Sequence, residues 1–252
     1  GYRHLGCKEA CCKIAWENPS MRRFPACLAL VDMSKKKYWL FDVTPEVKNQ
    51  IHMLDDFDCS LAGIFITHAH IGHCMGLINF GLEIMNTKNI PIYVMPEMKD
   101  HILNNSIFIQ LIINENIDII LLSNNKEIRI NENFSIEPFK VPHRNELSET
   151  VGYRIDGNKK SIIYLPDIDS WDEFEIELFK LIKSNDLLFI DGTFYTKDEI
   201  QNPQKLKIVW KNHFLVLFLL HQIDQKYLLI GLSTPNIKYV IFLLLIYCVF
   251  YL

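Results

Sequence analysis

The chain has 252 residues, a formal net charge of -4 and an apolar share of 49%. This length allows one large domain or two small ones and is ample for a buried core. The mildly negative balance gives no indication of a nucleic-acid partner, because proteins of that class carry basic patches. The seven cysteines are an odd number and no signal peptide opens the sequence, so we expect a reducing, cytoplasmic environment rather than a disulfide framework.

Short β-branched runs alternate with helical runs through residues 26–200. Two strands joined by a lysine-rich turn are expected from ACLALVDM, SKKK and KYWLFDV. Further strands are expected from LAGIFIT, IPIYVM, FSIEPFKVPH, VGYRI, KSIIYLPDI and DLLFIDGTF, and GLINFGLEIMN has the apolar spacing of a helix. The run SWDEFEIELFKLIKSN predicts an amphipathic helix with Ser170 as its N-cap and Glu173 three residues later. Strands interspersed with helices predict an α/β or α+β layered domain.

The two ends of the chain differ from this central part. Residues 1–25 are polar and rich in cysteine and are expected to be irregular. Residues 201–252 are very apolar and lack clear turn signals, so we treat residues 1–200 as one domain and 201–252 as a separate segment. The final run, Tyr239 to Leu252, has 14 residues and no charge. Because a bilayer core needs about 20 apolar residues, a buried terminus is expected first and a membrane tail anchor is the alternative.

Three of the nine histidines fall within THAHIGHCMG, residues 67–76, directly after the apolar run GIFIT. His68, His70 and His73 are close enough along the chain for one tight turn to bring their imidazoles to one side. A transition metal needs several neutral imidazoles within about 2 Å of one point. Scattered surface histidines are the alternative, but they do not account for an apolar strand that leads into the cluster. The stretch therefore predicts a metal-binding loop.

This loop resembles the signature of the metallo-β-lactamase-fold superfamily, whose usual pattern is His-x-His-x-Asp-His after a strand. More narrowly, the chain resembles a subfamily related to pyrroloquinoline-quinone biosynthesis protein B. The matching segments are LGCKEACC, LALVD, WLFDVTPE, THAHIGH, PIYVMPEM, VPHRNELSETVGYRI, YLPDID and DGTFY. The resemblance implies an α+β fold, the four-layer αββα sandwich of the metallo-β-lactamase type, for residues 1–200 with their Cys-rich N-terminal segment.

The resemblance also implies a ligand set, residue by residue. His68 and His70 stand at the imidazoles of the first metal, and His143 matches the later histidine that completes this site. His73 stands at the imidazole of the second metal. Asp167 matches the carboxylate that bridges two metals in binuclear members, and as the catalytic residue it would orient a metal-bound water.

Two departures from the superfamily pattern favour one firmly held ion, with the second weak or absent. Gly72 replaces the aspartate of the loop, which is a second-site ligand, and has no side chain. The best positional match to the last histidine is YLLIGLSTPN, which has none, and the contexts of His213 and His221 do not match. The second site then keeps only His73 and Asp167. Zinc is the default ion, and three imidazoles with a carboxylate suit Fe(II) or Mn(II) equally.

The cysteines near the start are candidates for a separate structural site. Cys7, Cys11 and Cys12 have the softness that zinc prefers, and His4 is the candidate for the fourth ligand. The biosynthesis relative carries a Cys-rich N-terminal zinc motif, which supports this hypothesis. Unbound thiols are the alternative.

Two aspartates end apolar strand runs at the edge where loop-built sites form. They are Asp42 in LFDVTP and Asp191 in LLFIDGTF. We expect Asp191 to accept a hydrogen bond from an imidazole N–H of a metal ligand, with a turn residue at a strand end as the alternative.

The resulting functional hypothesis is a metal-dependent hydrolase that uses a metal-bound water on a small-molecule ester, lactone or phosphodiester. With iron bound, the protein would instead be an oxygenase-type enzyme of cofactor biosynthesis. The third hypothesis is a degenerate family member that binds metal without chemistry, because Gly72, the missing last histidine and the apolar tail all depart from the pattern. Substrate choice lies in loops and added segments, so the fold does not identify the substrate.

Overall fold

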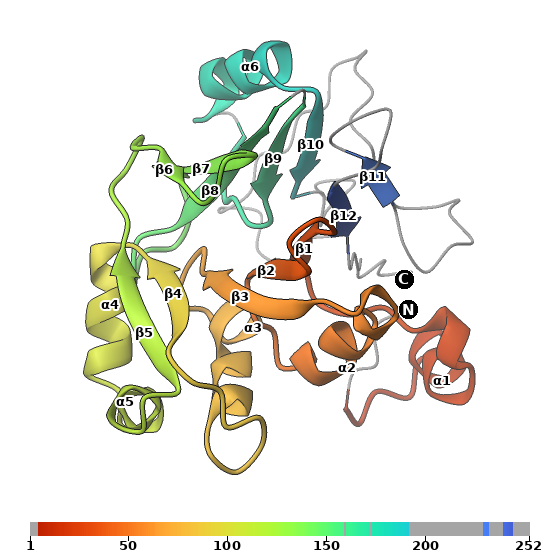
Figure 1. Ribbon diagram of the computed structural model, residues 1–252. Coiled ribbons are helices and arrows are strands. Elements are labelled where there is room, and N and C mark those ends of the chain that lie inside the picture. The colour runs from red at the N-terminus through yellow and green to blue at the C-terminus, as the bar shows by residue number, and fades with distance from the viewer. Residues whose placement is uncertain (1–4, 159, 172, 192–228, 232–238, 244–252) are drawn as a thin grey trace.

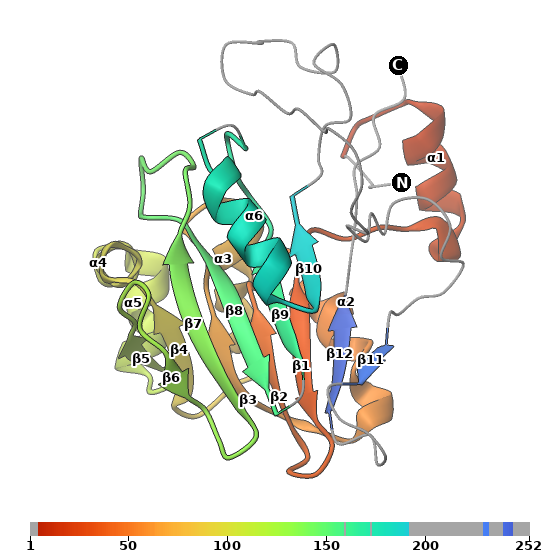
Figure 2. The ribbon, with the colours of Figure 1, turned by 90° about the horizontal axis from the view of Figure 1, so that it is seen from above.

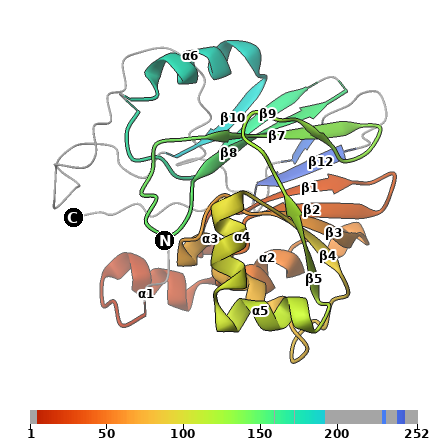
Figure 3. The same ribbon diagram turned by 90° about the vertical axis from the view of Figure 1, so that its left-hand side faces the viewer.

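The computed structural model describes residues 5–158, 160–171, 173–191, 229–231 and 239–243 (Figure 1). Within these residues, two β-sheets face each other and helices cover the outer face of each sheet. Figure 3 shows the resulting four layers, helices, sheet, sheet and helix, from one side. The expected αββα sandwich is therefore confirmed.

The first sheet has seven strands in the order β11-β12-β1-β2-β3-β4-β5. Their bounds are β1 Leu28–Asp32, β2 Lys37–Phe41, β3 Ser60–Phe65, β4 Ile90–Val94, β5 Ile117–Leu121, β11 Leu229–Gly231 and β12 Tyr239–Leu243. Strands β2 to β5 run parallel to one another, whereas β1 is antiparallel to β2 and β12. The carboxyl ends of β2 to β5 therefore meet at one edge of the sheet.

The second sheet has five strands in the order β10-β9-β8-β7-β6. Their bounds are β6 Ile128–Arg129, β7 Phe134–Lys140, β8 Val151–Gly157, β9 Ser161–Leu165 and β10 Leu187–Ile190. Strands β6 to β9 pair antiparallel, and β10 is parallel to β9. The carboxyl ends of β9 and β10 consequently lie at the same edge of this sheet.

The helices divide between the two outer faces. The α-helices are α1 Ala10–Glu17, α2 Val47–His52, α3 Ile71–Cys74, α4 Pro96–Leu103, α5 Ser106–Ile113 and α6 Glu175–Ser184. The described part of the chain also contains the short 3-10 helices η1 Pro19–Met21, η2 Asp55–Phe57 and η3 Met75–Phe80. Helices α2 to α5 cover the first sheet, and α6 lies across the second sheet above β8 and β9, as Figure 2 shows from above.

Side-chain alternation along the strands explains why the strand runs are apolar on both faces. On β1, Leu28 and Leu30 point between the two sheets, whereas Ala29 and Val31 pack in the core beneath the helices. A third apolar cluster joins the outer face of the second sheet to α6. A sheet that is covered on both faces requires this continuous apolar pattern.

The strands expected from the sequence are confirmed within the described residues, and residues 192–194 at the end of DLLFIDGTF lie outside them. Two helices differ from the expectation. The helix expected from SWDEFEIELFKLIKSN begins only at Glu175, because Trp171 and Phe174 turn inward and pack in the cluster beneath α6. Ser170 Oγ still accepts a hydrogen bond from the N–H of Glu173, at 3.3 Å. The run GLINFGLEIMN forms a 3-10 helix only as far as Phe80 and continues in turns.

Both terminal segments contain more structure than their composition indicated. Helix α1 and η1 lie in the N-terminal segment that was expected to be irregular. Strand β12, from the start of the last apolar run, pairs with the whole of β1, from Leu28 opposite Leu243 to Asp32 opposite Tyr239. No helix in the described part of the chain is long and apolar enough to cross a bilayer.

Gly76 marks a place where the loop after β3 meets the backbone after β2. A Cβ at Gly76 would clash with the main-chain carbonyl groups of Val43 and Thr44, whereas a Cβ at Gly72 would meet no atom within 4 Å. We expect Gly76→Ala to lower the free energy of unfolding by about 1–3 kcal/mol. We expect the matched control Gly72→Ala to be neutral or to stabilise by about 0.5 kcal/mol. Chemical denaturation measures both, and equal losses would contradict this account.

Candidate metal centre

The candidate site lies at the edge where β2, β3, β9 and β10 end. Asp42 follows β2, and Thr67 and His68 follow β3. Asp42 adopts a left-handed backbone conformation, with φ 65°, which aspartate tolerates better than most residues. Its fully buried carboxylate accepts hydrogen bonds from the N–H and the hydroxyl of Thr67, at 2.8 and 2.9 Å. Asp42 thereby joins the end of one strand to the start of the histidine loop.

The loop that follows β3 turns directly into α3. His70 is the residue before this helix and has an extended backbone, and its carbonyl accepts a hydrogen bond from the N–H of His73, at 2.9 Å. The carbonyl of His73 in turn accepts one from the N–H of Val43, at 2.8 Å. The predicted tight turn is therefore present and is attached to the backbone after β2.

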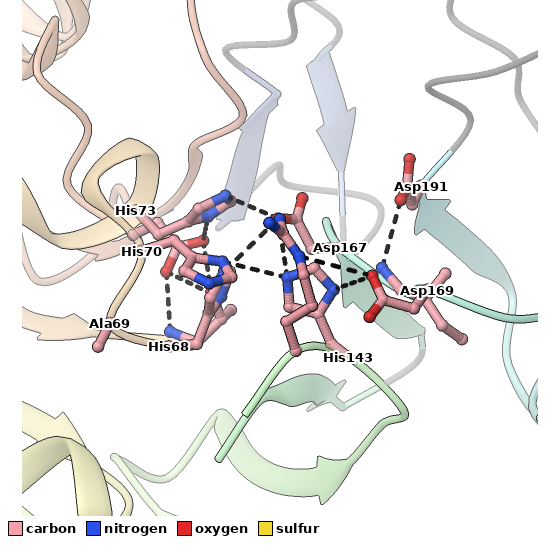
Figure 4. Close-up of polar contacts among 12 residues, drawn as sticks. His68, Ala69, His70, His73, His143, Asp167, Asp169 and Asp191 are labelled. Carbon is pink, nitrogen blue, oxygen red and sulfur yellow. Dashed lines mark hydrogen bonds and ion pairs between the residues drawn. The ribbon is translucent and has the colours of Figure 1, made fainter. Parts of the chain in front are cut away.

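Four side chains converge at this edge, as Figure 4 shows. They are His68, His70, His143 and Asp167, and one potential ligand atom from each lies within 4.8 Å of all the others. His70 Nδ1 lies 2.9 Å from His68 Nε2 and 3.2 Å from His143 Nε2. Asp167 Oδ2 lies 3.5 Å from His68 Nε2 and 3.6 Å from His143 Nε2. Among the described residues this is the one group of three or more such donors.

These distances fit a shared ion. Donors arranged tetrahedrally about 2.0–2.1 Å from zinc lie roughly 3.3 Å from one another. The neighbouring donors here lie 2.9 to 3.6 Å apart. A ring nitrogen has one lone pair or one N–H, so a hydrogen bond accounts for only one of the two close contacts of His70 Nδ1. One ion between the rings accounts for both contacts.

His73 lies outside the four-residue group, although its ring centroid is only 4.3 Å from that of His68. Its Nε2 is 3.2 Å from Asp167 Oδ2, and its Nδ1 is 2.8 Å from Asp42 Oδ2. Gly72, beside it, offers no ligand and faces open space. His213 and His221 lie outside the described residues. The described part of the second position therefore consists of His73 and Asp167.

Burial and charge give these groups different protonation behaviour. Burial lowers the pKa of His68 to about 4 and also lowers that of His143, so both imidazoles are neutral at pH 7, the form that binds metal. Burial alone would lower the pKa of His73, but the carboxylates of Asp167 and Asp42 raise it to about 10. Burial would raise the pKa of Asp167, but the charge of His73 and hydrogen bonds from His68 and His73 hold it well below its usual range.

The outward ring nitrogens of the three clustered histidines each contact an oxygen. His68 Nδ1 lies 2.9 Å from Thr67 Oγ1, and His70 Nε2 lies 3.3 Å from Glu146 Oε1. His143 Nδ1 lies 2.9 Å from Asp169 Oδ1, although the two groups are not aligned as a hydrogen bond. Partners of this kind fix the orientation of an imidazole that binds a metal.

The sequence did not indicate Thr67, Glu146 or Asp169 as site residues. Each lies within three residues of a histidine or aspartate of the cluster, but neighbours along the chain rarely face the same point. One general rule could have pointed to them: an imidazole that binds a metal usually has a hydrogen-bond partner at its second ring nitrogen. That rule predicts a carboxylate or hydroxyl beside each ring without saying which one.

Two further groups of candidate residues stay predictions: Asp191 as the acceptor of an imidazole N–H, and the cysteines as a zinc site. The carboxylate of Asp191, expected to hold an imidazole N–H, accepts a hydrogen bond from the backbone N–H of Ile168, at 3.2 Å, directly after Asp167 (Figure 4). Asp191 thus supports the backbone of the loop that carries Asp167. The thiols of Cys7 and Cys12 contact each other, whereas His4 and the side chain of Cys11 lie outside the described part of the chain. The structural zinc site stays a prediction.

Comparison with known proteins agrees with this fold. A family model described as the beta-lactamase superfamily domain matches residues 39–224. Because this match covers most of the chain, the protein belongs to the beta-lactamase superfamily. A search of curated proteins found no match.

Two solved structures show the same fold. Zinc-bound PqqB from Methylobacterium extorquens is 19% identical with a TM-score of 0.62, and the match covers 75% of this chain and 68% of that one. A diphosphatase from the PhnP family is 23% identical with a TM-score of 0.55, with the same coverage of 75% and 68%. At these identities the likeness concerns the fold alone.

Asp42 and Asp32 provide a matched test of the buried carboxylate beneath the site. Both are fully buried, but Asp32 lies at the opposite end of the sheet and accepts hydrogen bonds from Ser34 and Lys35. We expect Asp42→Asn and Asp32→Asn each to lower the free energy of unfolding by about 1–3 kcal/mol. Only Asp42→Asn should weaken metal binding, by about 10–100-fold, because Thr67 and His73 contact different oxygens of Asp42, and an amide NH2 in place of one oxygen cannot accept a hydrogen bond. Chemical denaturation and chelator competition measure the two effects, and similar zinc affinities in both variants would contradict the assignment.

Proposed function

We propose that this protein is a metal-dependent hydrolase that acts on a small-molecule ester, lactone or phosphodiester. The observation that carries the proposal is the convergence of four side chains: the imidazoles of His68, His70 and His143 lie at spacings that suit one shared ion, and the carboxylate of Asp167 lies beside them, next to the position left for water. Three imidazoles and a carboxylate from a single edge of the fold form a donor set of the kind found in catalytic metal sites.

When bound, a zinc ion supplies a water molecule whose pKa is lowered to about 7 and polarises a carbonyl or phosphoryl oxygen. The residues of the chain then have separate roles. His68, His70 and His143 hold the ion as neutral ligands. Asp167 stays ionised, and its Oδ2 lies within 3.6 Å of the ring nitrogens of His68, His73 and His143. Asp167 is thus placed to accept a hydrogen bond from the attacking water and to orient it.

The same geometry supports one firmly held ion and a second that is weak or absent. Among the residues that the structure describes, the second position offers His73 and the carboxylate that it shares with the first position. One of the two nitrogens of His73 is already directed at Asp42. Two ligands are too few for tight binding of zinc, which takes four in most protein sites.

A cavity of about 460 Å³ beside the cluster supports a small-molecule substrate. It lies between α4 and the segment after His143, and Glu146, which contacts His70, forms part of its wall. Its described lining includes the carboxylates of Glu97, Asp100 and Glu146 and no lysine or arginine. Such a lining favours a neutral ester or lactone over a phosphodiester, because a phosphodiester carries a negative charge.

The number of bound ions tests the proposed site. We expect freshly purified protein to keep one equivalent of zinc, iron or manganese through dialysis, as measured by elemental analysis. Gly72→Asp places a carboxylate in open space beside His73, so this variant should keep a larger share of a second equivalent. Gly72→Ala is the matched control and should behave as the unsubstituted protein does. Two equivalents held by the unsubstituted protein would contradict the single-ion hypothesis.

Charge at the cavity gives a test of substrate class. With 4-nitrophenyl acetate and bis(4-nitrophenyl) phosphate as probes, the double variant Glu97→Gln/Asp100→Asn should raise kcat/KM for the phosphodiester by about three- to tenfold, because charge repulsion is removed. Its kcat/KM for the ester should change little. Asp167→Asn should lower kcat for either probe by about 100-fold or more at saturating metal. Equal effects of the cavity variant on both probes would argue against this substrate preference.

The two other hypotheses have their own outcomes in the same assays. Oxygen consumption by the iron-loaded protein, without hydrolysis of any probe, would favour the oxygenase-type enzyme. Stable metal binding with no turnover of ester, lactone, phosphodiester or oxygen would favour a non-catalytic family member.

A further inference from the structure

We propose that the segment from Glu146 to Ser148 positions the metal loop, with Glu146 holding the ring of His70 and Ser148 holding the backbone between His68 and His70. The inference rests on the proposed metal site and adds two residues that do not bind the ion themselves. Glu146 and Ser148 would orient the ligands in the metal-free protein, so that the site is already formed when the ion binds.

The case for Glu146 comes from the two nitrogens of His70. Its Nδ1 faces the cluster, 2.9 Å from His68 Nε2 and 3.2 Å from His143 Nε2. Its Nε2 points the other way and lies 3.3 Å from Glu146 Oε1. An imidazole that uses Nδ1 as a ligand carries its proton on Nε2, and a carboxylate acceptor there selects this tautomer and fixes the ring plane.

The case for Ser148 comes from the backbone of the same loop. The N–H of Ala69, which lies between the first two histidines, donates to Ser148 Oγ at 3.0 Å in a buried contact. Ser148 Oγ lies 3.2 Å from the carbonyl oxygen of Glu149, to which it donates. The hydroxyl of Ser148 therefore accepts a hydrogen bond from the metal loop and donates one to the backbone of its own segment. These two hydrogen bonds fix the distance between the loop and the segment.

The segment is itself anchored, so it can serve as a fixed support. The buried carboxylate of Glu149 accepts a hydrogen bond from the N–H of Glu97, at 2.9 Å, in the first turn of α4. Three residues before this segment lies His143, the third imidazole of the cluster. One stretch of chain thus supplies one ligand and orients two ligands that come from the end of β3, about 75 residues earlier along the chain.

Because the side chain of Glu146 is exposed, its effect on the metal site can be tested without loss of stability. Its side chain is 55% exposed, and an exposed ion pair contributes little to stability. Replacement of Glu146 should therefore leave the fold intact while the ring of His70 loses its partner. Ser148 is buried, so its variants need the stability control that the glutamate variants do not.

The experiment measures Zn²⁺ affinity by competition with a chromogenic chelator, and thermal unfolding of the metal-free protein. Glu146→Leu should bind Zn²⁺ about 10–100-fold more weakly than the unsubstituted protein, with an unchanged melting temperature. Glu146→Gln should stay within about threefold, because its amide oxygen accepts the same hydrogen bond. Ser148→Ala should weaken binding and Ser148→Thr should restore it. Glu177→Gln, on the exposed face of α6, is the matched control and should match the unsubstituted protein.

The visible absorption of the Co²⁺-loaded protein gives a second readout. A ring of His70 that is free to turn should shift and weaken the Co²⁺ bands in Glu146→Leu, and Glu146→Gln should keep them. Unchanged affinity and bands in Glu146→Leu would overturn the inference. A Glu146→Gln variant as weak as Glu146→Leu would also overturn it, because loss of charge would then account for the effect. If the unsubstituted protein binds neither Zn²⁺ nor Co²⁺, the proposed function itself fails.

Discussion

The buried carboxylate of Asp42 is the contact on which the site depends. It accepts hydrogen bonds from Thr67 and contacts His73, so it links the end of β2 to the loop that carries three histidines. The hydroxyl of Tyr164, from the opposite sheet, lies 3.3 Å from the same carboxylate. A buried charge is costly unless it is satisfied in this way. Asp42 is therefore satisfied only when the two sheets and the loop are assembled together.

The layered fold explains why the ligands meet at one edge. Parallel strands place their carboxyl ends side by side, and β2, β3, β9 and β10 contribute Asp42, His68, Asp167 and Asp191 in this way. Below this edge, the aromatic rings of the core between the sheets pack against one another, with ring centroids 4.9 to 6.0 Å apart. A rigid scaffold of this kind holds loop residues in a defined geometry, which a metal centre requires.

The sequence predicted features that depend on residues close together in the chain, and it did not predict contacts between residues far apart in the chain. The spacing of His68, His70 and His73 after an apolar strand indicated a metal-binding loop without reference to any other segment. His143 and Asp167 were identified as ligands only through the resemblance to a family, because neither residue lies in a local cluster of potential ligands. The start of α6 was misplaced, since the packing of Trp171 competes with an N-cap at Ser170. Glu146 and Ser148 carried no local signal at all.

By itself, the sequence determined a layered domain of the α/β or α+β class, most of the strands and the histidine loop, because runs of apolar residues and close spacing of ligands are properties of short segments. Only the tertiary structure decided which side chains face one another. It brought His143 and Asp167 to the loop, directed Asp191 to a backbone N–H, and placed Glu146 against His70. Contacts between segments far apart in the chain depend on how the two sheets pack, and no local pattern records that packing.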